Sequence, residues 1–291
     1  MSVQLTLTAQ DKDLGGGFMV RRLLPATQRQ AVGPFLFFDH FGPLKVMPGE
    51  NHDVRPHPHI GLATVTYLFD GAIMHRDSLG TVQRIEPGAI NWMTAGRGIV
   101  HSERAPDDLK ARPYSTHGIQ LWAALPVPHE EVEPAFMHTP AADIPTLQVG
   151  DAQVRILIGK AFGKTSPVES FAPAVYLDVR LPAGGFFELP PLAPELAIYV
   201  IDNAIEIDDE VMAAHTLALL VAGQAARIHA PASARLMVLG GDPLRVQRLV
   251  WWNFVSSRKE RIEQASTDWR AQTMGKVAGD SEFIPLPERK I

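Results

Sequence analysis

Two pairs of metal-donor side chains stand out in the first half of the chain because each pair has the spacing i, i+2. His57 pairs with His59, and His101 pairs with Glu103. Residues two apart on a β-strand point to the same face, so each pair aims two donor atoms at one side of a sheet. Two such strands lying side by side would bring three imidazoles and one carboxylate together. The spacing therefore predicts one mononuclear metal site built from these four residues.

The donor types restrict the chemistry of this site. The chain has no cysteine, which excludes disulfides, cysteine nucleophiles and the thiolate ligands on which closed structural zinc sites mostly rely. Three imidazoles and one carboxylate, with room for water, suit Fe(II), Mn, Ni or Cu(II) in an open site. Open coordination positions indicate catalysis or sensing. The donors do not select among these metals, because intrinsic affinity alone would favour copper over iron.

Strands are the elements that must position the two pairs. Short runs rich in Val, Ile, Leu, Thr and aromatic residues, separated by Gly, Pro, Asp and Asn, extend from residue 3 to residue 250, and this pattern predicts an all-β protein. The expected strands include Gly61 to Phe69, Ile73 to Asp77, Thr81 to Ile85, Ala89 to Thr94, Gly118 to Leu125, Val154 to Ile158, Val175 to Leu181, Ala197 to Val200 and Arg235 to Leu239. Gly96 and Gly98 permit the sharp turn that would aim the second donor pair inward.

The length of 291 residues favours two domains. Residues 138–147 include two prolines and have no clean period, so we interpret them as a linker. This division predicts one β-domain over residues 1–137 and another over residues 148–291. Nine of the eleven histidines lie in the first half, so we expect the metal site in the N-terminal domain.

The end of the chain has a helical pattern. Ser257 and Glu260 match the spacing of a capping box, and Ile262 and Trp269 recur on one face. We therefore expect a short helix over about residues 257–274, at the end of the C-terminal domain.

The charge distribution argues against several classes of partner. The formal net charge is −5, without the clustered Lys and Arg that nucleic acids or anionic membranes select. The nearest basic run, Arg258 to Arg261, is interrupted by Glu260 and is expected to form a solvated helix face. The sequence has neither a leader pattern nor the ~20 apolar residues of a membrane span. We therefore expect a cytoplasmic protein that binds neither nucleic acid nor membrane.

Five segments of the sequence match a known family. They are Gly33–Asp39 (GPFLFFD), Arg55–Leu68 (RPHPHIGLATVTYL), Asn91–Glu103 (NWMTAGRGIVHSE), Gly118–Trp122 (GIQLW) and Trp251–Phe254 (WWNF). Through these segments the chain resembles the pirin family, a branch of the cupin superfamily. The resemblance extends over nearly the whole chain and is most specific in the first half.

This resemblance implies a bicupin, with two tandem jelly-roll β-barrels and a short C-terminal helix. It also implies one divalent metal in the N-terminal barrel, held by the two donor pairs. Fe(II) is the metal that the family implies, with Mn, Ni, Cu or Zn as alternatives. The second barrel of such proteins is metal-free, which agrees with His215 and His229 having no partner at ligand spacing. One departure from the family is His40 beside Asp39. The His40 side chain could lie near the pocket mouth or be exposed, and the sequence leaves both alternatives open.

Proteins similar to this one include bacterial enzymes that open flavonols such as quercetin with O2 and release carbon monoxide. The resemblance therefore implies an oxidoreductase like quercetin 2,3-dioxygenase, with a small aromatic flavonol and O2 as substrates. A flavonol hydroxyl could lose its proton and bind at an open metal position. Glu103, the one carboxylate among the four donors, is our candidate for the general base.

A flat aromatic substrate requires an apolar pocket at the barrel mouth. The candidate lining residues are Phe38, Trp92, Met93 and Trp122, and the candidates for hydrogen bonds that orient ligands or substrate are His117 and Gln120. The aromatic candidates suit the barrel core equally well, because aromatic residues in strands usually lie there.

Two other functions need the same four donors. Some proteins that resemble this chain are non-enzymatic regulators that bind a transcription factor or a metabolic enzyme, with the redox state of the iron acting as a switch. A third hypothesis is a relic barrel that binds metal adventitiously. The sequence does not separate these hypotheses from the dioxygenase.

Overall fold

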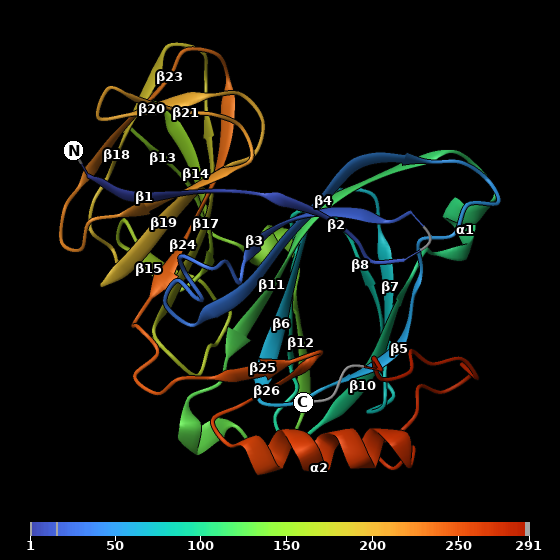
Figure 1. Cartoon of the computed structure of the whole chain (residues 1–291). Coiled ribbons are helices and arrows are strands. Elements are labelled where there is room, and N and C mark those ends of the chain that lie inside the picture. Colours follow the sequence, from blue (N-terminus) through green and yellow to red (C-terminus); the bar gives the residue numbers. More distant parts are fainter. Residues whose placement is uncertain (1, 16, 289–291) are drawn as a thin grey trace. The chain divides into compact units, whose positions relative to one another are not determined.

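The computed structural model describes residues 2–15 and 17–288 of the chain. This part of the chain folds mainly into antiparallel strands, as expected for an all-β protein (Figure 1). The helical elements among these residues are α1 (Asp107–Lys110), α2 (Lys259–Arg270) and the 3-10 turns η1 (Val127–His129) and η2 (Ala141–Asp143). No helix in the described ranges is long and apolar enough to cross a membrane.

Contacts within the chain divide it into two compact units that are not continuous in sequence. Unit 1 comprises Met1–Asp11, Arg21–Asp39 and Thr139–Leu244. Unit 2 comprises Lys12–Val20, His40–His138 and Arg245–Ile291. The internal boundary at residues 138 and 139 falls inside the segment predicted as a linker. Residues 138–147 are nevertheless ordered, because they include η2 and the start of a strand, and Ile144 is buried.

Unit 1 contains two antiparallel sheets that face each other. The larger sheet has the order β1 (Val3–Thr8), β22 (Thr216–Leu220), β19 (Glu195–Val200), β24 (Ala234–Gly241), β17 (Ala174–Leu181), β14 (Ala152–Ile158) and β13 (Thr146–Val149). The smaller sheet has the order β18 (Gly185–Leu189), β23 (Ala226–Ala230), β20 (Ile205–Ile207) and β21 (Glu210–Met212), and a separate hairpin joins β15 (Lys160–Ala161) to β16 (Lys164–Thr165).

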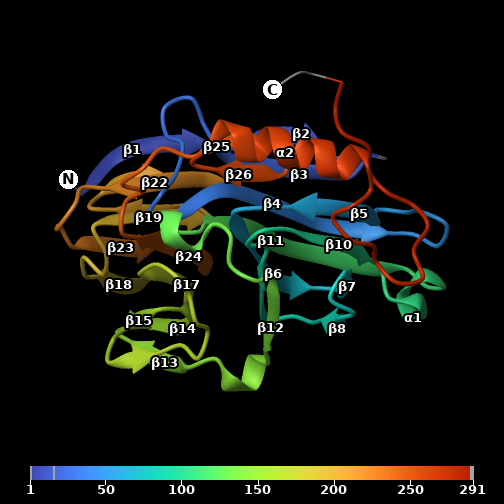
Figure 2. The same cartoon turned by 90° about the horizontal axis from the view of Figure 1, so that it is seen from below.

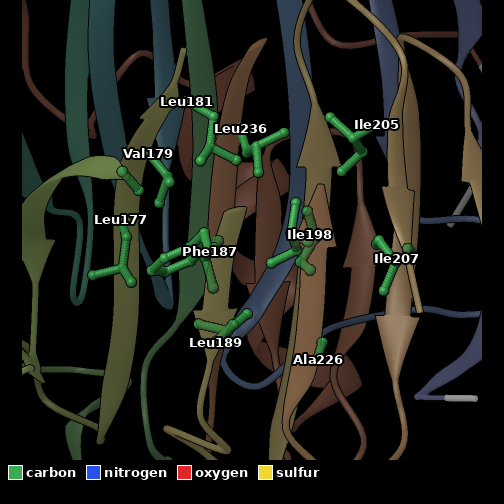
Figure 3. Packing of buried hydrophobic residues seen from close by; sticks show 14 of the residues in the cluster. Leu177, Val179, Leu181, Phe187, Leu189, Ile198, Ile205, Ile207, Ala226 and Leu236 are labelled. Atoms are coloured by element: carbon green, nitrogen blue, oxygen red, sulfur yellow. The ribbon is translucent and has the colours of Figure 1, made fainter. Parts of the chain in front are cut away.

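Alternate residues of these strands fill the space between the two sheets. Leu177, Ile198 and Leu236 come from the larger sheet, and Phe187 and Ile207 come from the smaller one. Figure 3 shows these side chains pointing toward one another. All five are at most 1% exposed, so the interior of unit 1 is an apolar core of the kind that alternating strands produce.

A second pair of sheets contains most of unit 2, although residues 10–11, 21–24, 35–39 and 139 of its larger sheet are assigned to unit 1. The larger sheet has the order β12 (Ala135–Thr139), β9 (Ile90–Thr94), β6 (Leu62–Asp70), β11 (Tyr114–Ala124), β4 (Phe35–Val46), β3 (Met19–Leu24) and β2 (Gln10–Asp13). The smaller sheet has the order β5 (Val54–His59), β10 (Ile99–Arg104), β7 (Ile73–Asp77) and β8 (Val82–Ile85), and a hairpin joins β25 (Leu249–Trp251) to β26 (Phe254–Ser256). The smaller sheet, which contains both donor pairs, is labelled in Figure 1.

The two compact units differ at both ends of the chain from the expected contiguous division into residues 1–137 and 148–291. In unit 1, β1 adds to the sheet by antiparallel pairing with β22, which joins the first residues of the chain to its second half. The terminal segment from Arg245 packs in unit 2, with the first half. Strand periodicity predicts which residues form a strand, but it does not identify the partner strand.

Helix α2 belongs to unit 2 and is shorter than the predicted 257–274. Its buried face, Ile262, Ala265 and Trp269, packs with Val100 of β10 and with Ile60, the residue that follows β5. Figures 1 and 2 both show α2 beside the β25–β26 hairpin.

The predicted capping box is absent from the start of α2. The residue that caps the helix is Arg258, and it makes no capping hydrogen bond through its side chain. The Ser257 hydroxyl instead donates to the buried Glu130 carboxylate, at 3.0 Å, and so is unavailable to the helix. A tertiary bond therefore outweighs a local capping preference.

We expect Ile262→Ala to lower the free energy of unfolding of unit 2 by about 2–5 kcal/mol, because the side chain is 1% exposed and its removal leaves a cavity under α2. Urea denaturation followed by tryptophan fluorescence measures this change. Gln264→Ala, on the exposed face of the same helix, is the control and should cost less than about 0.5 kcal/mol. Equal effects of the two substitutions would contradict the packing described for α2.

Candidate metal centre

Strands β5 and β10 bring three of the four predicted donors together. They pair antiparallel, with His101 directly opposite His57 and Ile99 opposite His59. His57, His59 and His101 are 7%, 1% and 1% exposed, and one nitrogen from each lies within 4.8 Å of the other two. The ring centroids of His57 and His101 are 4.3 Å apart. We call these residues the histidine cluster.

The turn before β10 depends on a glycine, as the sequence predicts. Gly96 has a φ of +50°, and a Cβ added to it would collide with the carbonyl oxygen of Val132. Only glycine tolerates both constraints without strain. The turn returns the chain so that β10 runs beside β5.

Two histidines of the cluster have their tautomers fixed by backbone carbonyls. Nδ1 of His57 donates to the carbonyl oxygen of Arg55 at 2.9 Å, and Nδ1 of His59 donates to the carbonyl oxygen of Asn253 at 3.2 Å. A carbonyl oxygen only accepts, so the proton of each neutral ring lies on Nδ1 and Nε2 keeps its lone pair. Within the described chain, the buried Nε2 of His101 has no hydrogen-bond partner. The cluster can therefore offer three imidazole nitrogens to one metal ion.

The electrostatics of the cluster favour neutral imidazoles. Burial lowers the pKa of His57 to about 4. Burial and the neighbouring rings also hold the pKa values of His59 and His101 well below their usual range. Because neutral imidazole is the form that binds metals, the three residues are ready to bind at neutral pH.

Glu103 lies on the same strand as His101 but outside the histidine cluster as the described residues form it. A register shift between β10 and β5 places it opposite Val54. Burial raises the pKa of its carboxyl, while His75 and the neighbouring Thr66 hydroxyl oppose that rise. Glu103 as a fourth ligand stays a prediction.

The opposite sheet contributes a polar row to the interior of unit 2. Thr66 of β6 is flanked by Gln120 on β11 and Asn91 on β9, and its hydroxyl donates to Gln120 Oε1 at 2.9 Å. His138 Nδ1 donates to Asn91 Oδ1 at 2.7 Å, which fixes the orientation of the amide. Asn91 is 2% exposed, and its Nδ2 has no partner among the described residues. Because Thr66 also contacts Glu103, this row faces the donor strands.

Two of the predicted pocket residues lie on this same face. Met93 and Trp122 both pair with Thr64, two residues before Thr66 on β6. The ring of Trp122 meets His59 edge to face, with centroids 5.1 Å apart. Met93, Gln120 and Trp122 therefore lie on one face of the sheet, and a substrate pocket there stays a prediction.

The pocket candidates Trp92 and Phe38 lie elsewhere. Trp92 points to the opposite face of β9 from Met93, where its Nε1 donates to the Thr94 hydroxyl at 3.1 Å. Phe38 belongs to unit 1 and packs edge-on against Tyr199 at 4.7 Å.

His117 also lies apart from the polar row, at the start of β11. Its Nε2 is 2.7 Å from Nε2 of His40, and its ring packs on Phe69 at 4.7 Å. A register shift separates His117 from the strand residues that follow it. His40, whose place the sequence leaves open, is buried in this pair.

Two residues that contact the cluster are not among the candidates predicted from the sequence. His75 and Asp77, on β7, are 2% and 1% exposed, and His75 Nδ1 is 3.4 Å from His101 Nδ1. They have the same i, i+2 spacing as the two donor pairs and lie in a segment predicted as a strand. The spacing was therefore a signal that could have found them.

Two antiparallel double-sheet domains, one of them with a buried histidine cluster in its interior, define a two-domain cupin. Sequence profiles support this class in both halves of the chain. The profile described as Pirin matches residues 17–123, and the profile described as Pirin C-terminal cupin domain matches residues 176–275.

Individual proteins match over most of their length. A pirin-like protein of Caulobacter vibrioides is 43% identical over 290 residues, covering 98% of this chain and 100% of that protein. Pirin of Homo sapiens is 33% identical over 276 residues, covering 92% of each chain. A crystal structure of quercetin 2,3-dioxygenase from Acinetobacter baumannii has a TM-score of 0.89 and 32% identity, covering 100% of this chain and 97% of that one. The chain belongs to the pirin family.

We expect the metal-free protein to lose stability as the pH falls from about 6.5 to 4. Over this range His57 becomes protonated in the unfolded chain but stays neutral in the folded protein, where its pKa is about 4. Because the unfolded chain binds more protons, acid favours unfolding. The contribution of His57 is on the order of 3 kcal/mol. Urea denaturation at a series of pH values, compared with His57→Gln, measures it. The account of the buried cluster is wrong if the two proteins have the same pH dependence.

Proposed function

We propose that this protein is a metal-dependent oxidoreductase, with Fe(II) as the metal, that cleaves flavonols such as quercetin with O2. The observation that carries the proposal is the histidine cluster, whose neutral, buried rings present nitrogens to one point. Support also comes from the protein named quercetin 2,3-dioxygenase in Acinetobacter baumannii, to which the chain is similar over its whole length.

The residues fit a divalent metal. An unpartnered buried nitrogen such as His101 Nε2 costs free energy unless a ligand satisfies it. Cluster nitrogens would hold the ion, with Glu103 as the proposed fourth ligand. A bound metal would supply Lewis acidity and a template for the flavonol and O2.

The chain's own residues would bind and deprotonate the flavonol. Burial raises the pKa of Glu103, which makes its carboxylate a stronger base toward a flavonol hydroxyl. The Thr66 hydroxyl lies beside that carboxylate on the inner side of the sheets. Asn91 Nδ2, which is buried and unpartnered in the described structure, can donate a hydrogen bond to a substrate oxygen.

Apolar side chains complete the proposed substrate site. Trp122 and Met93 lie one row from Asn91 on the same face of the sheet. Their flat and flexible surfaces suit an aromatic ring system and exclude water from it.

We expect the iron-loaded protein to consume O2 and release carbon monoxide in equal amounts when supplied with quercetin. Glu103→Gln should lower kcat about 10²- to 10⁴-fold, because the amide does not accept the hydroxyl proton. Glu86→Gln, at an exposed carboxylate of the same unit, is the matched control and should keep full activity.

The assay should be repeated with Mn, Ni and Cu and with a panel of flavonols. Absence of turnover with every metal and every flavonol would contradict the dioxygenase proposal. That result would leave the non-enzymatic regulator as the hypothesis to pursue.

A further inference from the structure

Asp77 is a carboxylate held in place by its own turn. Its Oδ1 accepts hydrogen bonds from the backbone amides of Leu79 at 2.9 Å and Thr81 at 3.0 Å. Its Oδ2 lies 3.0 Å from His75 Nε2. Burial acts to raise its pKa, but the bonds from His75 and Thr81 outweigh burial and lower it. Two backbone amides occupy Oδ1 and an imidazole nitrogen faces Oδ2, so both carboxylate oxygens of Asp77 act as acceptors.

The fixed carboxylate sets the proton position on His75. Because Asp77 only accepts, the proton between the two residues belongs to His75 Nε2. The ring of His75 is also held in plane by stacking on Phe136, with centroids 4.3 Å apart and planes at 22°. A neutral His75 in this orientation turns the lone pair of its Nδ1 toward His101, 3.4 Å away.

His101 differs from the other two histidines of the cluster in its hydrogen-bond acceptor. His57 and His59 each donate Nδ1–H to a backbone carbonyl, whereas Nδ1 of His101 faces the ring of His75. An acceptor at His75 Nδ1 places the proton of His101 on Nδ1. Its buried and unpartnered Nε2 is then the nitrogen with the lone pair.

We propose that Asp77 and His75 are positioning residues that fix the tautomer and ring orientation of His101, so that its Nε2 is available as a metal ligand. Asp77 acts through His75 and touches none of the three histidines' proposed metal-binding nitrogens. The part of the proposal that concerns metal affinity rests on the proposed function, whereas the part that concerns the tautomer does not. Hydrogen-bond acceptors behind ligand histidines commonly have this effect in metalloproteins.

Asp77→Asn should reverse the direction of the chain of hydrogen bonds. The amide Oδ1 can still accept from Leu79 and Thr81, so the turn is kept. The amide Nδ2 donates where the carboxylate accepted, which moves the proton of His75 to Nδ1. His75 then donates to His101 Nδ1 and places the proton of His101 on Nε2, the nitrogen that a metal requires free.

The direct test is the tautomer of His101 in the metal-free protein, measured by long-range ¹H–¹⁵N NMR of the histidine rings. We expect the proton on Nδ1 in the unsubstituted protein and on Nε2 in Asp77→Asn. Glu206→Gln is the matched control, because it alters the other histidine–carboxylate pair, Glu206 with His229 in unit 1. It should leave His101 unchanged.

The second test is Ni(II) affinity by competition with a chelator. Asp77→Asn should weaken binding about 10- to 100-fold, and His75→Leu should do the same because it removes the acceptor. If Asp77 acts through His75, adding Asp77→Asn to His75→Leu should change the affinity less than twofold. Glu206→Gln should bind as the unsubstituted protein does.

The outcomes separate this proposal from the proposed function. A proton on His101 Nε2 in the unsubstituted metal-free protein overturns the proposal, and that spectrum does not depend on the folding of any variant. Unchanged Ni(II) affinity in folded Asp77→Asn also overturns it. The expected tautomers together with no flavonol turnover would support the positioning role while contradicting the dioxygenase.

Discussion

The antiparallel register between β5 and β10 is the constraint on which the rest of the site depends. It places His57 opposite His101, and the period of two along β5 then adds His59 to the same face. A shift of the register by one residue would turn one pair to the other face of the sheet. The glycine turn at Gly96 returns β10 to this position, and the packing of α2 on Ile60 and Val100 supports the same two strands from behind.

Burying three imidazoles side by side costs free energy, which hydrogen bonds with their surroundings offset. Each ring loses its hydration, and mutual repulsion opposes any protonation, so the rings stay neutral. Each Nδ1 nevertheless has a hydrogen-bonding neighbour, two of them backbone carbonyls. One of those carbonyls belongs to Asn253, in the terminal segment that packs with the first half of the chain. The discontinuous arrangement of unit 2 thus contributes directly to the site.

Much of the local structure was predictable from the sequence because it follows from periodicity. The strand expected at Ile73 to Asp77 has the same bounds in the structure, and the i, i+2 spacing brought His57, His59 and His101 together. The same period could have prevented one error, since the adjacent residues Trp92 and Met93 cannot both face the interior of one strand pair. The same spacing of two residues also relates His75 to Asp77, although these two were not among the predicted candidates.

Features that depend on contacts distant in sequence were not predictable in this way. No local pattern encodes strand pairing between distant segments. That pairing places Phe38 and the first residues of the chain in unit 1, and the segment from Arg245 in unit 2. Ser257 has the spacing of a cap, but its hydroxyl is bound by Glu130, more than one hundred residues earlier. Glu103 and its neighbour Thr66 likewise come from strands of opposite sheets.

X-ray absorption spectroscopy of the iron-loaded protein tests the central claim most directly, because it counts the imidazoles bound to the metal. The account predicts one iron per chain with three imidazole ligands, and two imidazole ligands in the His101→Ala protein. Fewer than three imidazoles in the unsubstituted protein, or an unchanged spectrum after His101→Ala, would contradict a metal site built on the histidine cluster.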